Sequence, residues 1–171
     1  MATRIRSAGS VLGRGLVAGV FGGVLFILVE MAISVAIGLP VMEPFRVIGS
    51  IVQGPAALSP GFPVSTAVAS GLVLHFLLSA VYGMIFTAVL HLVWRREIPS
   101  LGFLVLGISY AVLLWILNFL VIAPVLSPQI ATQGSFLMGF TIAHAAYGLG
   151  LGGFVAYGTW QADAGATGTR V

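Results

Sequence analysis

Residues 13–38, GRGLVAGVFGGVLFILVEMAISVAIG, form an apolar stretch that is long enough to cross a lipid bilayer. About 20 helical residues, rising roughly 1.5 Å each, span the ~30 Å hydrocarbon layer. One carboxylate, Glu30, lies inside this stretch. A charge at that depth costs about 3 kcal/mol on insertion scales, so we expect Glu30 to be neutralised, paired or turned toward other protein.

Three glycines share one face of this predicted helix with Glu30. Gly15, Gly19 and Gly23 recur at every fourth residue, and Glu30 lies further along the same face. Small residues on one face allow a second helix to approach closely. We therefore expect a neighbouring helix here, and another subunit against any small-residue surface that the chain does not cover itself.

The composition excludes a soluble globular domain. The chain is 59% hydrophobic and 6% charged, with a mean hydropathy of +1.14, whereas soluble domains carry about 25% charged residues. Cysteine and lysine are absent, which excludes disulfides, thiolate metal sites and Schiff-base lysines. The net charge of +3 comes from arginines that lie mostly near predicted helix ends, so it indicates membrane topology and no nucleic-acid binding.

The hydrophobic segments predict an all-α fold, an integral membrane four-helix bundle that forms one domain over residues 1–171. The predicted spans are 13–38, 67–94, 101–123 and 136–160, with outer loops at 39–66 and 124–135 and a flexible C-terminal tail at 161–171. With an even number of spans, every arginine except Arg46 falls on one side, so the positive-inside rule places both termini in the cytoplasm. The expected location is the cytoplasmic (inner) membrane of a prokaryote.

Short matching motifs favour a tandem duplication. Each half of the chain contains a proline-bounded pentapeptide, a Gln-Gly step and a Tyr-Gly step, at 40–44, 53–54 and 82–83 and again at 124–128, 133–134 and 147–148. We therefore expect two helical hairpins related by an axis along the membrane normal, a parallel internal repeat. Chance similarity between proline-bounded helix ends is the alternative.

The first outer loop contains an amphipathic segment. Its apolar residues would line one side of a short helix, with Arg46 and Gln53 facing water; they are Phe45, Val47, Ile48, Ile51 and Val52. The expected arrangement is a cap folded over the bundle, and a re-entrant element is the alternative.

Counting residues from the predicted outer helix ends places four polar groups at one level. Glu30, His75, Asn118 and His144 lie roughly 9–13 Å below those ends, one on each helix. We therefore expect a polar intramembrane layer. Supporting side chains on the same faces are Ser79, Tyr82 and Tyr147, and the predicted packing residues beyond the first helix are Gly139, Ala143, Ala146 and Gly150.

Three interpretations of this layer stay open. In the first, it is a hydrogen-bonded girdle in which a neutral Glu30 donates to a histidine or to Asn118. In the second, Glu30, His75 and His144 form a path for protons or a solute. In the third, His75 and His144 bind haem b, or a transition metal together with Glu30. No catalytic residue is identified, and no cofactor is expected under the first two interpretations.

The chain resembles small, uncharacterised four-helix inner-membrane protein families of bacteria and archaea. The residues that carry this resemblance are Glu30-Met31, Pro40, Pro44, His144 and Tyr147-Gly148. The resemblance implies a membrane location and no established activity. We predict a non-enzymatic accessory or structural subunit, or a homo-oligomer, whose partners are the bilayer and other membrane subunits; a small carrier or proton-conducting protein and a redox subunit are the alternatives.

Overall fold

The computed structural model describes the backbone of residues 8–93, 98–131 and 134–167, and the side chains of residues 11–93, 98–130 and 139–157. Within these ranges the chain is helical and contains no strand. The long helices are α1 (Ala8–Ala36), α3 (Val64–Val93), α4 (Ser100–Trp115) and α7 (Gly134–Thr167). The shorter ones are α2 (Glu43–Gln53), η1 (Pro55–Leu58), the π-helix η2 (Ile116–Ile122), α5 (Ala123–Leu126) and α6 (Pro128–Ala131).

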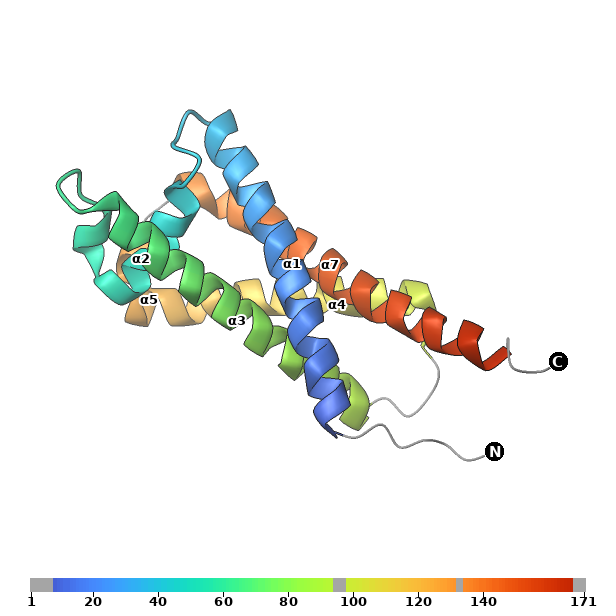
Figure 1. Cartoon of the computed structure of the whole chain (residues 1–171). Helices are drawn as coiled ribbons and strands as arrows, with labels where there is room; N and C mark the ends of the chain where they lie inside the picture. The colour runs from blue at the N-terminus through green and yellow to red at the C-terminus, as the bar shows by residue number, and fades with distance from the viewer. Residues whose placement is uncertain (1–7, 94–97, 132–133, 168–171) are drawn as a thin grey trace.

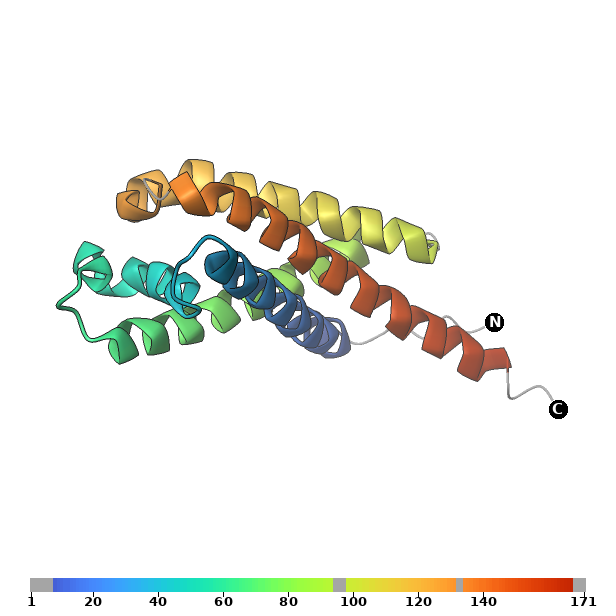
Figure 2. The ribbon, with the colours of Figure 1, turned by 90° about the horizontal axis from the view of Figure 1, so that it is seen from above.

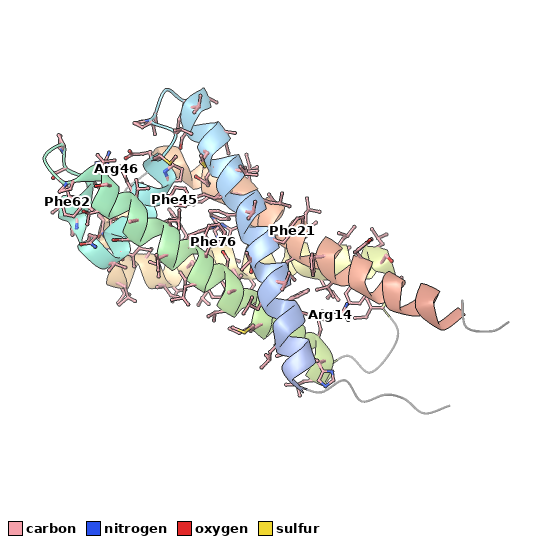
Figure 3. The ribbon with its side chains drawn as sticks, in the orientation of Figure 1. Arg14, Phe21, Phe45, Arg46, Phe62 and Phe76 are labelled. Carbon is pink, nitrogen blue, oxygen red and sulfur yellow. The ribbon has the colours of Figure 1, made fainter. Side chains whose placement is uncertain are left out.

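Four helical segments are long and apolar enough to cross a membrane. They are Val11–Ala36, Val64–Val93, Ser100–Leu126 and Gly139–Tyr157. Large apolar side chains cover their outer faces, and Phe21 on α1 is one example (Figure 3). The prediction of an all-α, membrane-embedded helical bundle is confirmed.

The helices form two pairs that meet along a third contact. α1 packs along α3, α4 packs along α7, and α1 crosses α7 between the pairs (Figures 1 and 2). Among the described residues, α3 and α4 make no contact of comparable extent, although they are consecutive long helices. The bundle is therefore closed on three sides and loosely joined on the fourth.

Glycine makes each helix pair close. A Cβ on Gly83 of α3 would collide with the backbone of Gly15 and Gly19 of α1. A Cβ on Gly148 of α7 would meet the backbone of Gly107 of α4 in the same way. The two Tyr-Gly steps predicted to be equivalent therefore both place glycine at the helix contact of their own hairpin. The two hairpins are present, and their origin by duplication stays a prediction.

The predicted small-residue faces are covered inside the chain. Gly19 and Gly23 of α1 contact Ser79 of α3, and Gly150 of α7 contacts Gly22 and Leu25 of α1. Ala143 is fully buried, Ala146 is partly buried, and Gly139 lies against the carboxyl group of Glu30.

Helix α2 confirms the predicted short helix in the first loop, and it packs on the first turns of α3. Gly49 of α2 lies against the backbone of Ala67 and Gly71. On its apolar side, Phe45, Val47 and Ile48 are buried (Figure 3 labels Phe45), whereas Ile51 and Val52 are exposed. This arrangement is a cap against the bundle.

The prediction that Arg46 and Gln53 face water is wrong. Arg46 forms an ion pair with Glu43 at 2.9 Å and donates to the carbonyl of Ala57 at 3.3 Å. Gln53 donates to the hydroxyl of Ser70 on α3 at 2.7 Å. Because the loop folds back onto α3, both side chains find partners within the protein.

The third span does not end at residue 123 as predicted. Pro124 lacks the N–H group that would bond to the carbonyl of Leu120, and the turns before it widen into the π-helix η2. There the N–H of Ala123 bonds to the carbonyl of Asn118. The helix continues to Leu126, and Asn118 lies in a widened turn of a kind that is frequent at functional sites.

The segment predicted as a flexible tail, 161–171, is helical as far as Thr167. Ala162, Ala164 and Ala166 favour helix strongly, and no proline interrupts the segment. Residues 168–171 lie outside the described residues.

We predict that Gly83→Ala destabilises the protein by roughly 1–3 kcal/mol, because its methyl group would force α1 and α3 apart. Gly13→Ala is the matched control, since a Cβ on Gly13 meets no atom within 4 Å. The measurement is the thermal midpoint of each variant in detergent micelles. Equal midpoints for both variants would contradict the close contact of α1 with α3.

Candidate functional site

A cavity of about 340 Å³ lies on the loosely joined side of the bundle, between α3 and the η2–α5 segment. Side chains from α1, α7 and α2 also line it, among them Phe26, Phe140 and Ile48. Six of the seven polar residues predicted to form or support the intramembrane layer line it: His75, Ser79, Tyr82, Asn118, His144 and Tyr147. The sequence therefore predicted most of the polar wall of this cavity.

The mouth of the cavity is apolar. Ile51, Ile122 and Leu126 line the cavity and are also 40%, 36% and 71% exposed, so they border its opening. Among the residues whose side chains the structure describes, no acidic residue, arginine or lysine lines the cavity. Ile122 and Leu126 belong to a helix that is long and apolar enough to cross a membrane.

Each cavity histidine has one ring nitrogen bonded to a backbone carbonyl. His75 Nε2 donates to the carbonyl of Gly23 at 2.9 Å, and His144 Nδ1 donates to that of Phe140 at 2.6 Å. A carbonyl oxygen only accepts, so the nitrogen that meets it carries the hydrogen. The second nitrogen of each uncharged imidazole is then an acceptor. No described residue donates to it.

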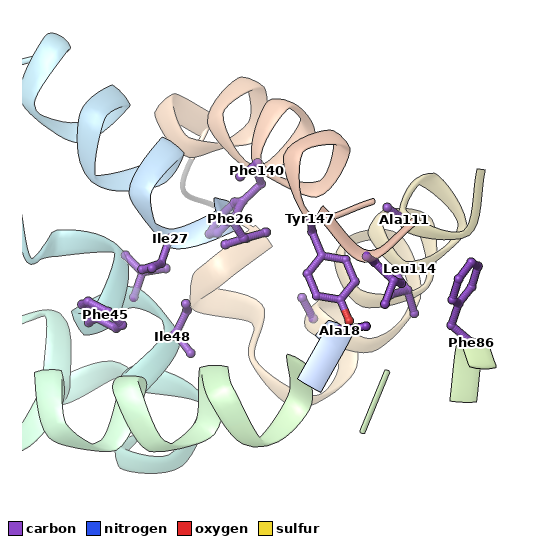
Figure 4. Close-up of a cluster of buried hydrophobic side chains, with 14 of the residues drawn as sticks. Ala18, Phe26, Ile27, Phe45, Ile48, Phe86, Ala111, Leu114, Phe140 and Tyr147 are labelled. Atoms are coloured by element: carbon purple, nitrogen blue, oxygen red, sulfur yellow. The ribbon is translucent and has the colours of Figure 1, made fainter. Parts of the chain in front are cut away.

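Phe26 of α1 lies beside both imidazoles. Its ring centroid is 5.3 Å from that of His75 and 5.0 Å from that of His144. Phe140 packs against Phe26 from α7, as Figure 4 shows. The histidines therefore share an apolar neighbour. Within the described residues, no group of three histidine, cysteine, aspartate or glutamate side chains is placed to hold a metal ion.

Tyrosine hydroxyl groups connect the two hairpins across the cavity. Tyr82 of α3 donates to Asn118 Oδ1 at 2.7 Å, and Tyr147 of α7 donates to the carbonyl of Ser79 at 2.9 Å. Tyr110 of α4 donates to the carbonyl of Tyr82 at 3.0 Å. These bonds fix the walls of the cavity relative to each other and hold the Asn118 amide in place.

Two hydrogen-bond donors of the cavity have no partner among the described residues. Asn118 is half-buried and accepts from Tyr82 at Oδ1, and its amide N–H groups make no bond to a described residue. The hydroxyl of Ser127 is buried without a partner. A buried polar group that lacks a partner carries a desolvation cost, which a bound molecule with an acceptor oxygen would relieve.

Glu30 does not line the cavity, which corrects the prediction that it donates to a histidine or to Asn118. It is fully buried where α1 meets α7, close to Gly139. Neither carboxyl oxygen has a hydrogen-bond partner in the described part of the chain, and neither does the hydroxyl of Ser34 one turn later. Phe26, one turn before Glu30, occupies the position beside the histidines.

The phenylalanines of the site and the hydroxyl group of Ser127 were missed at the sequence level. Phe26 lies three residues after Gly23 and four before Glu30, so it shares the face that was identified from its neighbours. Phe119 follows Asn118 directly, and Ser127 belongs to the second proline-bounded motif. The helical spacing of Phe26 was a usable signal, whereas nothing in the sequence distinguishes Phe119 and Phe140 from lipid-facing phenylalanines.

A family model described as a family of unknown function (DUF6789) matches residues 10–164. The chain belongs to DUF6789. The match includes all four membrane-capable helices and every residue of the cavity, and it agrees with the resemblance to uncharacterised membrane protein families. No curated protein and no solved structure matches the chain.

In this DUF6789 protein we predict that Glu30 is uncharged at neutral pH. A buried ionised carboxylate without a partner costs several kcal/mol, and holding a proton removes most of that cost. The infrared spectrum should contain the carbonyl band of a protonated carboxylic acid, and Glu30→Gln should abolish it. Glu43→Gln is the control and should leave the band unchanged, because Glu43 is paired with Arg46. A band that survives Glu30→Gln would contradict the prediction.

Proposed function

We propose that this protein is a membrane-embedded binding protein whose ligand is a small lipid-soluble molecule. The observation that carries the proposal is the cavity between α3 and the η2–α5 segment. Its volume of about 340 Å³ falls within the range of small-molecule sites, which are mostly apolar and contain a few oriented polar groups. An apolar mouth with His75, Asn118 and His144 in the wall has that character.

A purely structural or accessory subunit, or a homo-oligomer, has less support. That prediction depended on small residues that stay uncovered within the chain and are free to contact another subunit. The contacts of Gly15, Gly19 and Gly23 with α3, and of Gly150 with α1, use these residues inside the chain. We therefore favour ligand binding as the main function, with the bilayer as the surroundings from which the ligand enters.

The carrier and redox alternatives each require an arrangement of side chains that the structure does not have. A proton path through Glu30, His75 and His144 would need contact between Glu30 and the histidines, and Glu30 lies outside the cavity that they line. Binding of haem b or a transition metal by His75 and His144 would need both imidazoles to face a common centre, and Phe26 lies against both rings.

The proposed orientation of the protein in the membrane follows from the distribution of its arginines. We propose that both termini lie in the cytoplasm of a prokaryotic cell, because six of the seven arginines then lie on that side of the inner membrane. The mouth of the cavity, near Ile51 and Leu126, then lies in the half of the membrane away from the cytoplasm.

The proposal predicts saturable binding of a bromoalkane. Trp115 stacks on Phe119, which lines the cavity, so bromine in the cavity should quench its fluorescence. The protein for this experiment carries Trp94→Phe and Trp160→Phe, so that Trp115 is the only tryptophan. Titration with 1-bromododecane in micelles should give quenching that saturates at one molecule per chain, above a linear background from partitioning.

A matched pair of variants tests whether the bromoalkane binds in the cavity. Ala123 lines the cavity and is buried, so Ala123→Phe should fill the space and abolish the saturable component. Val125, two residues away, is 77% exposed and does not line the cavity, so Val125→Phe should leave it intact. Linear quenching alone in the parent protein, or equal loss in both variants, would contradict the proposed function.

A further inference from the structure

The chemistry of the cavity wall selects among lipid-soluble molecules, and this selection rests on the proposed function. In the described part of the chain, the lining contains no arginine or lysine to bind a phosphate headgroup and no carboxylate to bind an amine. A charged headgroup would therefore be buried without a counter-charge, at a cost of several kcal/mol. The occupant must be uncharged.

The unused hydrogen-bonding groups of the cavity wall define which polar group the ligand must have. His144 lines the cavity and has Nδ1–H committed to the carbonyl of Phe140, so Nε2 of the uncharged ring is left as an acceptor. Asn118 has Oδ1 committed to Tyr82, so its amide N–H groups are donors. One group that both donates and accepts, a hydroxyl, satisfies this pair.

The remaining wall favours a flat ring beside that hydroxyl. Phe26, Phe119 and Phe140 all line the cavity, and each makes a ring contact with another aromatic side chain at 5.0–6.4 Å between centroids. Aromatic rings prefer to pack against one another in tilted or offset arrangements. The apolar mouth at Ile122 and Leu126 gives an alkyl or isoprenoid tail a way out into the lipid.

We propose that the cavity binds an uncharged phenol- or quinol-type amphiphile, with its ring hydroxyl between His144 Nε2 and the Asn118 amide and its tail leaving through the apolar mouth. The hydroxyl donates to the imidazole and accepts from the amide. No covalent or redox step is part of this proposal.

Three probes with the same decyl tail separate the contribution of the hydrogen-bond donor from that of the acceptor. 4-Decylphenol donates and accepts, 4-decylanisole only accepts, and decylbenzene does neither. Each probe displaces 1-bromododecane from the single-tryptophan protein, and the recovery of Trp115 fluorescence reports the displacement. We expect 4-decylphenol to bind at least tenfold more tightly than decylbenzene, with 4-decylanisole in between. Decyl phosphate should bind more weakly than 4-decylphenol.

Two variants test whether His144 and Asn118 bind the hydroxyl of the probe. His144→Phe should remove the difference between 4-decylphenol and 4-decylanisole, because it removes the acceptor. Asn118→Leu should remove the difference between 4-decylanisole and decylbenzene, because it removes the donor. Unchanged decylbenzene binding in both variants shows that they have kept the fold.

The outcomes distinguish the two proposals. Equal affinity for the three neutral probes, or tighter binding of decyl phosphate, would overturn the ligand class while saturable binding still supports the proposed function. Absence of saturable 1-bromododecane quenching in the parent protein would overturn the proposed function itself.

Discussion

The structure depends on the close contact of two helix pairs at glycine. Gly83 brings α3 onto α1, and Gly148 brings α7 onto α4, each at a point where any side chain would collide with backbone. In a membrane, such close packing supplies much of the attraction between helices, because lipid tails are as apolar as the side chains they contact. Since α1 also packs on α7, α3 and α4 do not pack closely along their lengths, and the cavity lies on this side, between α3 and the η2–α5 segment.

Pro124 and Tyr82 shape the cavity between α3 and the η2–α5 segment. The missing N–H of Pro124 accompanies the π-helix that carries Asn118, and Tyr82 bonds to the Asn118 oxygen across the gap. Gln129 donates to the carbonyl of Ser50 at 3.0 Å, which connects α6 to α2. The polar groups therefore hold the walls in place, and the groups that they leave unused point to a ligand with a polar oxygen.

The sequence predicted the helices and the polar wall for a simple reason. Hydropathy and helical spacing decide which residues are buried in a membrane bundle, and His75, Asn118 and His144 stood out against an apolar background. The same spacing placed Glu30 on the buried face of its helix, but spacing along one helix does not determine which side chain of its partner it meets. Phe26, not Glu30, lies beside the histidines.

The cavity itself was not predictable from the sequence, because it depends on which pairs of helices pack together. Hydropathy identifies four spans but not which of them are neighbours, and the close contacts at Gly83 and Gly148 are visible only in three dimensions. The widened turn at Asn118 was likewise hidden, since Pro124 was interpreted as the end of a helix.

The most direct test of this account is anomalous diffraction from crystals grown in a lipid mesophase with 1-bromododecane. We expect α3 and the η2–α5 segment to remain separated, with bromine density between them, bounded by Leu78, Asn118 and Ile122. Bromine density spread over the outer faces of the helices, or α3 packed directly on η2 with no space between them, would contradict it.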